Sequence, residues 1–144
     1  SVEKKAGTDG KKLVILAKQI IRVDAAGDGH YQTSRTGHKH KGIDLVCKPG
    51  ESIFSPGDGK VVKIGLAYSG DNRYNSYHIA LDSGLRLKLL YVKPLFKLND
   101  PVQAGQIIAT SQNIAAKYGG SMINHVHVEV ISNGFTIDPT NFFI

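Results

Sequence analysis

The sequence has 144 residues, 41% hydrophobic and 21% charged, which is enough for one globular domain that buries a core without disulfides. Its longest apolar run, Leu13 to Ala17, is far shorter than the roughly 20 residues of a membrane-spanning helix, and no signal-peptide pattern precedes it. The net charge of +6 predicts weak attraction to anionic surfaces, but no helix-turn-helix, RNP-like or zinc-finger pattern supports nucleic-acid binding.

In chain order, residues 1–12 are polar and rich in lysine and are expected to be mobile, with a folded core at about 24–144. Two stretches are candidate helices: 13–23, whose apolar residues fit neither the helical nor the strand period well, and the short segment 112–118. Glycine-punctuated runs of β-branched and apolar residues predict strands at 42–46, 52–55, 59–65, 77–82, 85–92, 106–111 and 125–131. Ser83-Gly84 and Asn133-Gly134 predict tight turns. This pattern predicts one mostly β domain with few short helices.

Two histidines stand two residues apart in the strand predicted at 125–131. A strand points residues i and i+2 to the same face, so His125 and His127 leave the sheet together while valines line the other face. His40 and Asp44 are separated by four residues, which in extended chain again gives one face, and Gly42 allows a bend between them. The two motifs can therefore converge on one ion.

Zinc is the natural candidate for such a site. Two imidazoles and one carboxylate are borderline ligands, and three protein ligands leave a fourth position for water. Zinc lowers the pKa of a bound water and can polarise a carbonyl. Taken alone, each motif is more often structural, but three of the six histidines lie in these two short segments, which favours a shared metal site.

Three segments carry a family resemblance: HKGIDLVCKPGESIFSPGDGKVV, HVHVEV and DPTNFF. Together they resemble the lysostaphin-type zinc metallopeptidases, which cut peptide cross-bridges in bacterial cell walls, over about residues 37–143. The resemblance implies an antiparallel β-sheet or β-sandwich core. It also implies that His40, Asp44 and His127 bind one zinc ion and that His125 is the catalytic or oxyanion-stabilising histidine.

One position departs from the family pattern. Active members carry a histidine in a Tyr-x-His-Leu segment, where this chain has YVKPL with Lys93 in place of that histidine. An ammonium group has no lone pair and cannot accept a proton from zinc-bound water. We therefore expect incomplete catalytic machinery, with Lys93 at the substituted position of the groove and Tyr91 as a candidate ligand contact near its floor.

A narrower resemblance is carried by GDGHYQTSR, by Cys47 shortly after Asp44, by YVKPL and by Glu129 after the paired histidines. These features resemble the leukocyte cell-derived chemotaxin 2-like proteins. That group implies a secreted, zinc-binding ligand of cell-surface receptors without demonstrated peptidase activity. Its members hold several disulfides, whereas Cys47 is the only cysteine here and is expected to be a small buried side chain. A bacterial cell-envelope or phage protein therefore remains an alternative.

Three functions stay open from the sequence. The first is a zinc-stabilised, peptidase-inactive domain that binds a receptor or partner protein. The second is an active zinc endopeptidase for cell-wall or glycine-rich peptides, in which Lys93 stabilises the tetrahedral intermediate. The third is a basic module that binds sulfated glycans or anionic cell wall.

Overall fold

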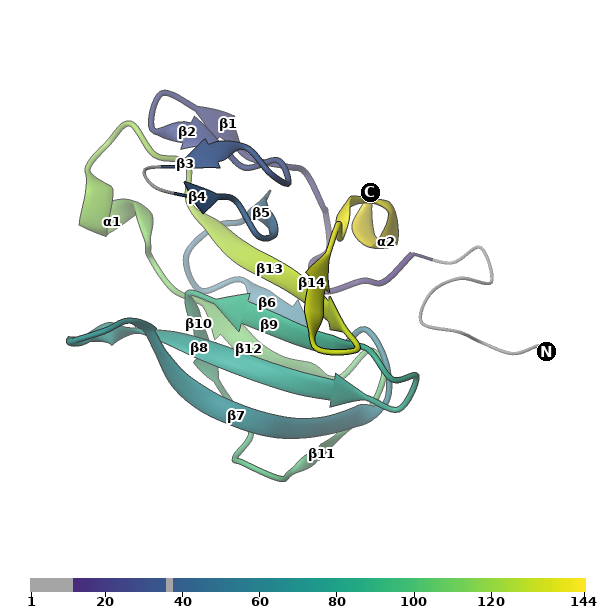
Figure 1. The fold of residues 1–144 in the computed structure, drawn as a ribbon. Helices are drawn as coiled ribbons and strands as arrows, with labels where there is room; N and C mark the ends of the chain where they lie inside the picture. The colour runs from purple at the N-terminus through teal and green to yellow at the C-terminus, as the bar shows by residue number, and fades with distance from the viewer. Residues whose placement is uncertain (1–11, 36–37) are drawn as a thin grey trace.

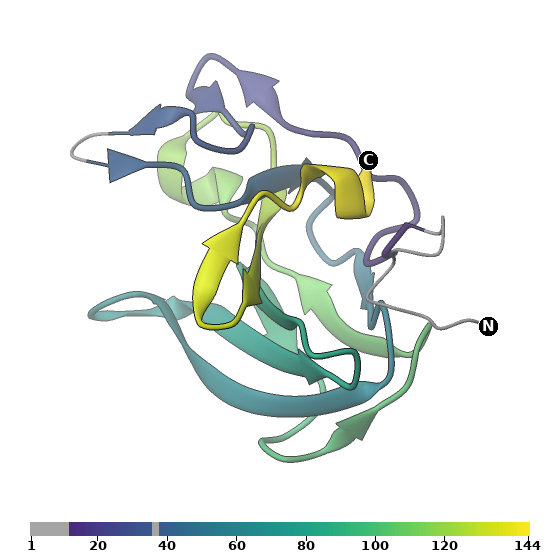
Figure 2. The same cartoon turned by 45° about the vertical axis from the view of Figure 1, so that its right-hand side comes forward.

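The computed structural model describes residues 12–35 and 38–144, and these form a large curved β-sheet packed on a smaller one (Figure 1). The expected mobility of residues 1–12 falls, apart from Lys12, outside the described residues. Figure 2 shows two small hairpins, one formed by residues 23–28 and one that pairs residues 34–35 with 38–39, together above the sheets. Among the described helices, none is long and apolar enough to cross a membrane.

The large antiparallel sheet has the order β11-β7-β8-β9-β13-β14, and β5 also pairs with β13. Its strands are β5 (Ile43–Val46), β7 (Gly59–Tyr68), β8 (Asp71–Leu81), β9 (Arg86–Leu90), β11 (Pro101–Val102), β13 (His125–Ser132) and β14 (Phe135–Ile137). The small sheet has the order β10-β12-β6, with β10 (Val92–Pro94), β12 (Ile107–Ser111) and β6 (Ser52–Phe54). The remaining elements are the hairpins β1 (Val23–Asp24) with β2 (Gly27–Asp28) and β3 (Ser34–Arg35) with β4 (His38–Lys39), and the single-turn helices α1 (Ala115–Tyr118) and α2 (Thr140–Phe143).

The core lies between the two sheets and follows the two-residue period of the strands. On β13, Val126, Val128 and Val130 are fully buried in it, while His125 and His127, which alternate with them, point to the other face. All seven predicted segments form strands, with 85–92 divided between β9 and β10, so the prediction of a mostly β, antiparallel fold is confirmed. The core also includes Leu13, so the packed chain begins earlier than the expected residue 24.

The helix expected at 13–23 is absent, and that prediction is wrong. Its backbone bonds elsewhere: the carbonyl of Ile15 accepts from the amide of Phe54 at 2.8 Å. The Gln19 side chain accepts from the Ile15 amide at 2.8 Å and donates to the carbonyls of Leu13 at 3.0 Å and Phe143 at 2.8 Å. Such side-chain bonds offer the backbone an alternative to the helix. Of the second predicted helix, 112–118, only the last turn forms, and it ends at Gly119 with φ +76°.

Gly42 sets the distance between the first metal motif and the last long strand. A Cβ atom at this position would lie 2.0 Å from the Val128 carbonyl oxygen, so only glycine allows this close approach. The approach brings β5 into register with β13, with Asp44 directly opposite His127. Gly42 thus allows the segment of His40 and Asp44 to pack against the segment of His125 and His127, more than 80 residues later in the chain.

His78 lies on the outer face of the large sheet and is 7% exposed. Burial, together with the positive charges of Arg86, Lys88 and Lys63, lowers the pKa of His78 to about 4, against a smaller opposite effect of Glu129. Arg86 also donates to His78 Nδ1 from Nε at 3.2 Å and from Nη2 at 3.0 Å. The folded state therefore holds this imidazole neutral.

This arrangement predicts acid sensitivity. Between about pH 6.5 and about pH 4 the unfolded chain binds a proton at His78 and the folded chain does not, so stability falls as the pH falls through this range. His78→Asn keeps an acceptor for Arg86 but cannot titrate. We expect its free energy of unfolding to fall by about 1–3 kcal/mol less than that of wild type over this pH range. Urea unfolding at several pH values measures this, and parallel curves for the two proteins would contradict it.

Candidate metal centre

Three side chains from two strands and a loop converge at the face of the large sheet. His127 Nδ1 lies 3.0 Å from Asp44 Oδ1, and His40 Nε2 lies 3.0 Å from His127 Nδ1 and 3.2 Å from Asp44 Oδ1. All three residues are buried. We call them the metal triad. Ligands about 2.0–2.1 Å from a tetrahedral zinc ion stand about 3.3 Å apart, close to these separations.

Hydrogen bonds behind the triad fix which ring nitrogen faces the centre. His40 Nδ1 donates to the His30 carbonyl oxygen at 2.9 Å, which leaves the lone pair on Nε2. His127 Nε2 donates to Glu129 Oε2 at 2.8 Å, which leaves the lone pair on Nδ1. Two lone pairs then face each other and cannot bond to one another, whereas a shared cation satisfies both. The group could hold one metal ion.

The second oxygen of Asp44 faces arginine. Arg22, which is 3% exposed, donates from Nη2 to Asp44 Oδ2 at 3.2 Å and from Nη1 to Asp24 Oδ1 at 2.9 Å. Burial alone would raise the pKa of Asp44, but without a metal ion a proton held at the centre lets His127 or His40 donate to Asp44, which outweighs burial and holds that pKa well below the usual range. Asp44 is therefore a carboxylate with one oxygen for a metal and the other for Arg22.

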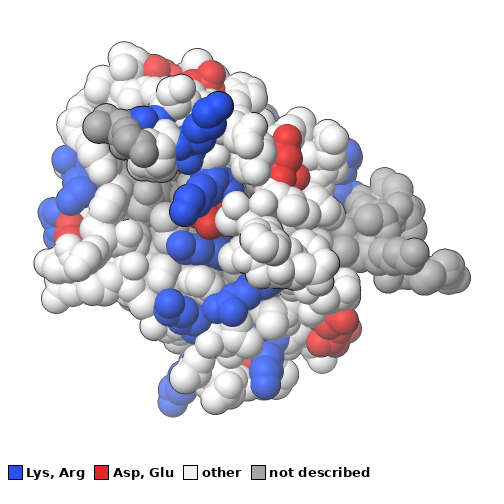
Figure 3. Space-filling model, in the orientation of Figure 1, with Lys and Arg blue, Asp and Glu red and all other residues white. Residues whose placement is uncertain are grey.

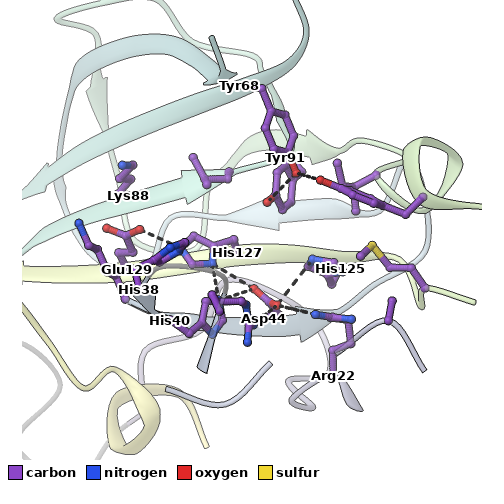
Figure 4. A pocket seen from close by; sticks show the side chains of 17 residues that line it. Arg22, His38, His40, Asp44, Tyr68, Lys88, Tyr91, His125, His127 and Glu129 are labelled. Atoms are coloured by element: carbon purple, nitrogen blue, oxygen red, sulfur yellow. Dashed lines mark hydrogen bonds and ion pairs between the residues drawn. The ribbon is translucent and has the colours of Figure 1, made fainter. Parts of the chain in front are cut away.

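His125 lies beside the triad on the same face of β13 (Figure 4). Its Nδ1 donates to the Ile123 carbonyl oxygen at 2.9 Å, and its Nε2 lies 3.7 Å from Asp44 Oδ2. Burial lowers the pKa of His125, against the opposing charge of Asp44. The imidazole is thus a neutral proton acceptor beside the metal position.

A cavity of about 680 Å³ opens over these residues. Three tyrosines line one side of it: the Tyr68 hydroxyl lies 2.7 Å from that of Tyr118 and donates to that of Tyr91 at 3.3 Å. The Tyr91 ring stands edge-on to His125, with ring centroids 5.5 Å apart. The cavity therefore presents a polar metal face and a phenolic wall.

Of the two residues expected at the groove, only Tyr91 lines the cavity. Lys93 is exposed on β10, paired with Thr110 of the small sheet. The separation arises at Tyr91, whose φ of +70° ends β9, so that the next residues join the other sheet. The expectation that Lys93 lies in the groove is not met.

Sequence reasoning missed several residues of the site. Arg22, Tyr68 and Tyr118 line the cavity but belong to segments without a motif, and Arg35 ends the GDGHYQTSR segment, which gave no role to this side chain. Glu129 did carry a signal, because it follows His127 by two residues and so shares its face. The other four depend on long-range packing.

This fold and this buried triad define the chain as a metal-binding β domain of the metallopeptidase type. The sequence matches Peptidase family M23 over residues 38–139, and the chain belongs to that family.

Three similar proteins place it further. Mouse leukocyte cell-derived chemotaxin-2 is 30% identical over 126 residues, which are 88% of this chain and 80% of that protein. The catalytic domain of lysostaphin from Staphylococcus simulans has a TM-score of 0.62 at 29% identity, covering 81% of this chain and 89% of that one. A zinc-containing peptidase from Vibrio cholerae has a TM-score of 0.62 at 26% identity, covering 89% of this chain and 38% of its own. Both resemblances seen in the sequence are confirmed.

Proposed function

We propose that this chain binds one zinc ion at His40, Asp44 and His127 and acts as a secreted domain that binds a protein partner without cutting peptides. One observation carries the proposal: the side chain that faces His125 in the cavity is Tyr91, a phenol and not a second imidazole. The similarity to a protein named as a chemotaxin supports the role of a ligand and the extracellular location.

The phenol of Tyr91 is a proton donor at neutral pH. Burial raises its pKa to about 12, against a smaller opposite effect of the hydrogen bond from Tyr68. His38 also lines the cavity, but Figure 4 shows it on the side of Glu129, away from His125. Among the described residues, His125 is therefore the one imidazole that can accept a proton on the Tyr91 side of the triad, and loss of a general acid or base costs about 10²–10⁴ in rate.

Zinc bound at the triad would supply a polarising charge at the cavity floor. The chain's own groups then hold the site together: Glu129 and the His30 carbonyl orient the two imidazoles, and Arg22 orients the carboxylate. Because the ligands come from the segment around β4 and β5 and from β13, the ion would tie an early part of the chain to a late one. Such a tie stabilises the folded state without any reaction.

A second candidate function is an active endopeptidase. The observation in its favour is the neutral His125 beside the triad in an open cavity, together with the similarity to the lysostaphin catalytic domain. In this alternative His125 is the imidazole that accepts the proton beside the triad, and the Tyr91 hydroxyl donates to the developing oxyanion.

A hydrolysis assay separates the two. We expect the zinc-loaded protein to cut a pentaglycine cross-bridge peptide at least about a thousandfold more slowly than lysostaphin, because a catalytic acceptor is missing. Tyr91→His, which places an imidazole in the cavity, is compared with Lys93→His, which places one outside it. We expect a gain in rate only from Tyr91→His. Turnover by wild type that disappears in His125→Ala would overturn the proposal, and so would failure of the zinc-loaded protein to bind cell surfaces.

A further inference from the structure

The outer face of the large sheet carries two adjacent rows of residues next to the metal centre. Cross-strand pairing puts Lys63 opposite His78, His78 opposite Lys88, and Lys88 opposite Glu129. The next row contains Lys60, Ala80, Arg86 and Ile131. Residues directly opposite in an antiparallel sheet share a face, so Lys60, Lys63, Arg86 and Lys88 lie together. We call these four residues the basic tetrad.

The tetrad lies on the solvent side of the sheet. The residues that alternate with it, among them Val61, Ile79 and Leu87, are fully buried in the core. Strands lie about 4.8 Å apart and alternate residues of a strand about 6.6 Å apart, so the four backbone positions span about 10 Å by 7 Å. Four positive charges are therefore held on a rigid, polar surface of small area.

Little on this face neutralises these charges. Among the ion pairs of residues 12–35 and 38–144, none involves a tetrad residue. The carboxylate in the two rows is Glu129, which is 7% exposed and accepts a hydrogen bond from His127. Arg86 is oriented by its two hydrogen bonds to His78.

The charged surface is continuous with the cavity. Lys88 and Lys41 both line the cavity, and Lys88 is also a member of the tetrad. Figure 3 shows Lys and Arg side chains gathered in a band that runs from the middle of this view down over the large sheet. A chain-like anion that lies on the tetrad can therefore extend toward the metal centre.

We propose that the basic tetrad binds a sulfated polysaccharide. Such a chain carries fixed negative groups at high density on a stiff polar backbone, which complements a flat cationic sheet face. Single-stranded nucleic acid is bound largely by stacking on aromatic side chains, and the two rows contain no aromatic residue besides the buried His78. Membrane-surface binding needs apolar side chains that enter the lipid, and in these rows only Ile131 is large and apolar, and it is half-buried.

The test compares two charge-matched variants of the full chain. The first combines Lys60→Gln, Lys63→Gln and Lys88→Gln and keeps Arg86, because Arg86 bonds to His78. The second combines Lys18→Gln, Lys48→Gln and Lys97→Gln, which are exposed lysines outside the two rows. Binding to a size-defined heparin oligosaccharide is measured at about 150 mM salt and over a salt series. Equal melting temperatures for both variants show that the fold is kept.

We expect the first variant to lose on the order of 30-fold in affinity with a shallower salt dependence, and the second to lose less than about threefold. Desulfated oligosaccharide of the same length is expected not to bind. Equal losses in the two variants would show general charge attraction and overturn the assignment. Equal binding of desulfated chains would overturn the class of ligand. So would tetrad-dependent binding, as tight as that of heparin, of phosphatidylserine vesicles or of an oligonucleotide. The peptidase assay has no bearing on these outcomes, so this inference stands or fails separately from the proposed function.

Discussion

Chelation of zinc from the loaded protein is expected to lower its melting temperature by about 8–16 °C. A ligand that binds only the folded state adds about 4 kcal/mol at a thousandfold excess over its dissociation constant. In a chain of about 150 residues each kcal/mol shifts the melting temperature by about 2–4 °C. The buried triad supplies the reason for binding only to the folded state, because His127 lies 83 residues from Asp44 and 87 from His40 and meets them only where β13 packs on β5 and the loop before it.

The shift in melting temperature is large because the metal-free centre is poorly satisfied. His40 Nε2 and His127 Nδ1 lie 3.0 Å apart, with both lone pairs directed at the centre by the bonds to His30 and Glu129. Without a metal ion, a proton must enter the centre or the rings must turn away from these partners. Either change weakens the contact between β13 and the loop that carries His40.

A matched pair of variants isolates the triad. His40→Ala is expected to melt at the same temperature with and without chelator, because it removes one of the three ligands. His38→Ala, an exposed neighbour that also lines the cavity, is expected to keep the full shift. A wild-type melting temperature that does not change after complete removal of zinc, verified by elemental analysis, would end the structural role of the metal.

The triad was predictable because strand geometry is periodic. His125 and His127 fall on one face by their spacing alone, and the buried valines that alternate with them confirm the alternation. The two-residue turn at Asn133 and Gly134 was predictable for a similar reason, since both adopt positive φ, at 51° and 83°. Short-range chemistry was sufficient for these features.

The position of Lys93 was not predictable, because one residue changed the sheet to which it belongs. Alternation over 85–92 suggested a single strand, but Tyr91 at φ +70° divides it into β9 of the large sheet and β10 of the small sheet. A shift of one residue in a strand moves every later side chain to the other face.

That the chain forms one domain over all 144 residues stays a prediction.

Arg22 was missed for another reason. Its segment was a candidate helix, and a helix has no strand register that would place Arg22 beside Asp44. In the structure an isolated bridge pairs Ile21 with Leu45, and the amide of Arg22 donates to the Asp44 carbonyl oxygen at 2.8 Å. The backbone pairing thus carries the guanidinium to the carboxylate.

Arg22→Met is expected to destabilise the metal-free protein by about 3–5 kcal/mol, because it removes the partner of two buried carboxylates, Asp44 and Asp24. It is also expected to weaken zinc binding by about 10–100-fold, since Asp44 loses the group that orients it. Urea unfolding after chelation measures the first effect, and competition with a zinc-responsive dye measures the second.

The matched control is Arg35→Met. Arg35 Nη2 lies 3.8 Å from the same Asp44 oxygen, but its side chain is 24% exposed, so we expect a loss of less than about 1 kcal/mol. Arg22→Lys keeps the positive charge but not the planar guanidinium that reaches both carboxylates. Its losses of stability and of zinc affinity are expected to lie between those of Arg22→Met and Arg35→Met. If Arg22→Met and Arg35→Met had equal effects on stability and on zinc affinity, the triad would depend only on the general positive charge around it. A larger effect at Arg22 means that the two buried hydrogen bonds of its guanidinium hold the metal-binding carboxylate in place.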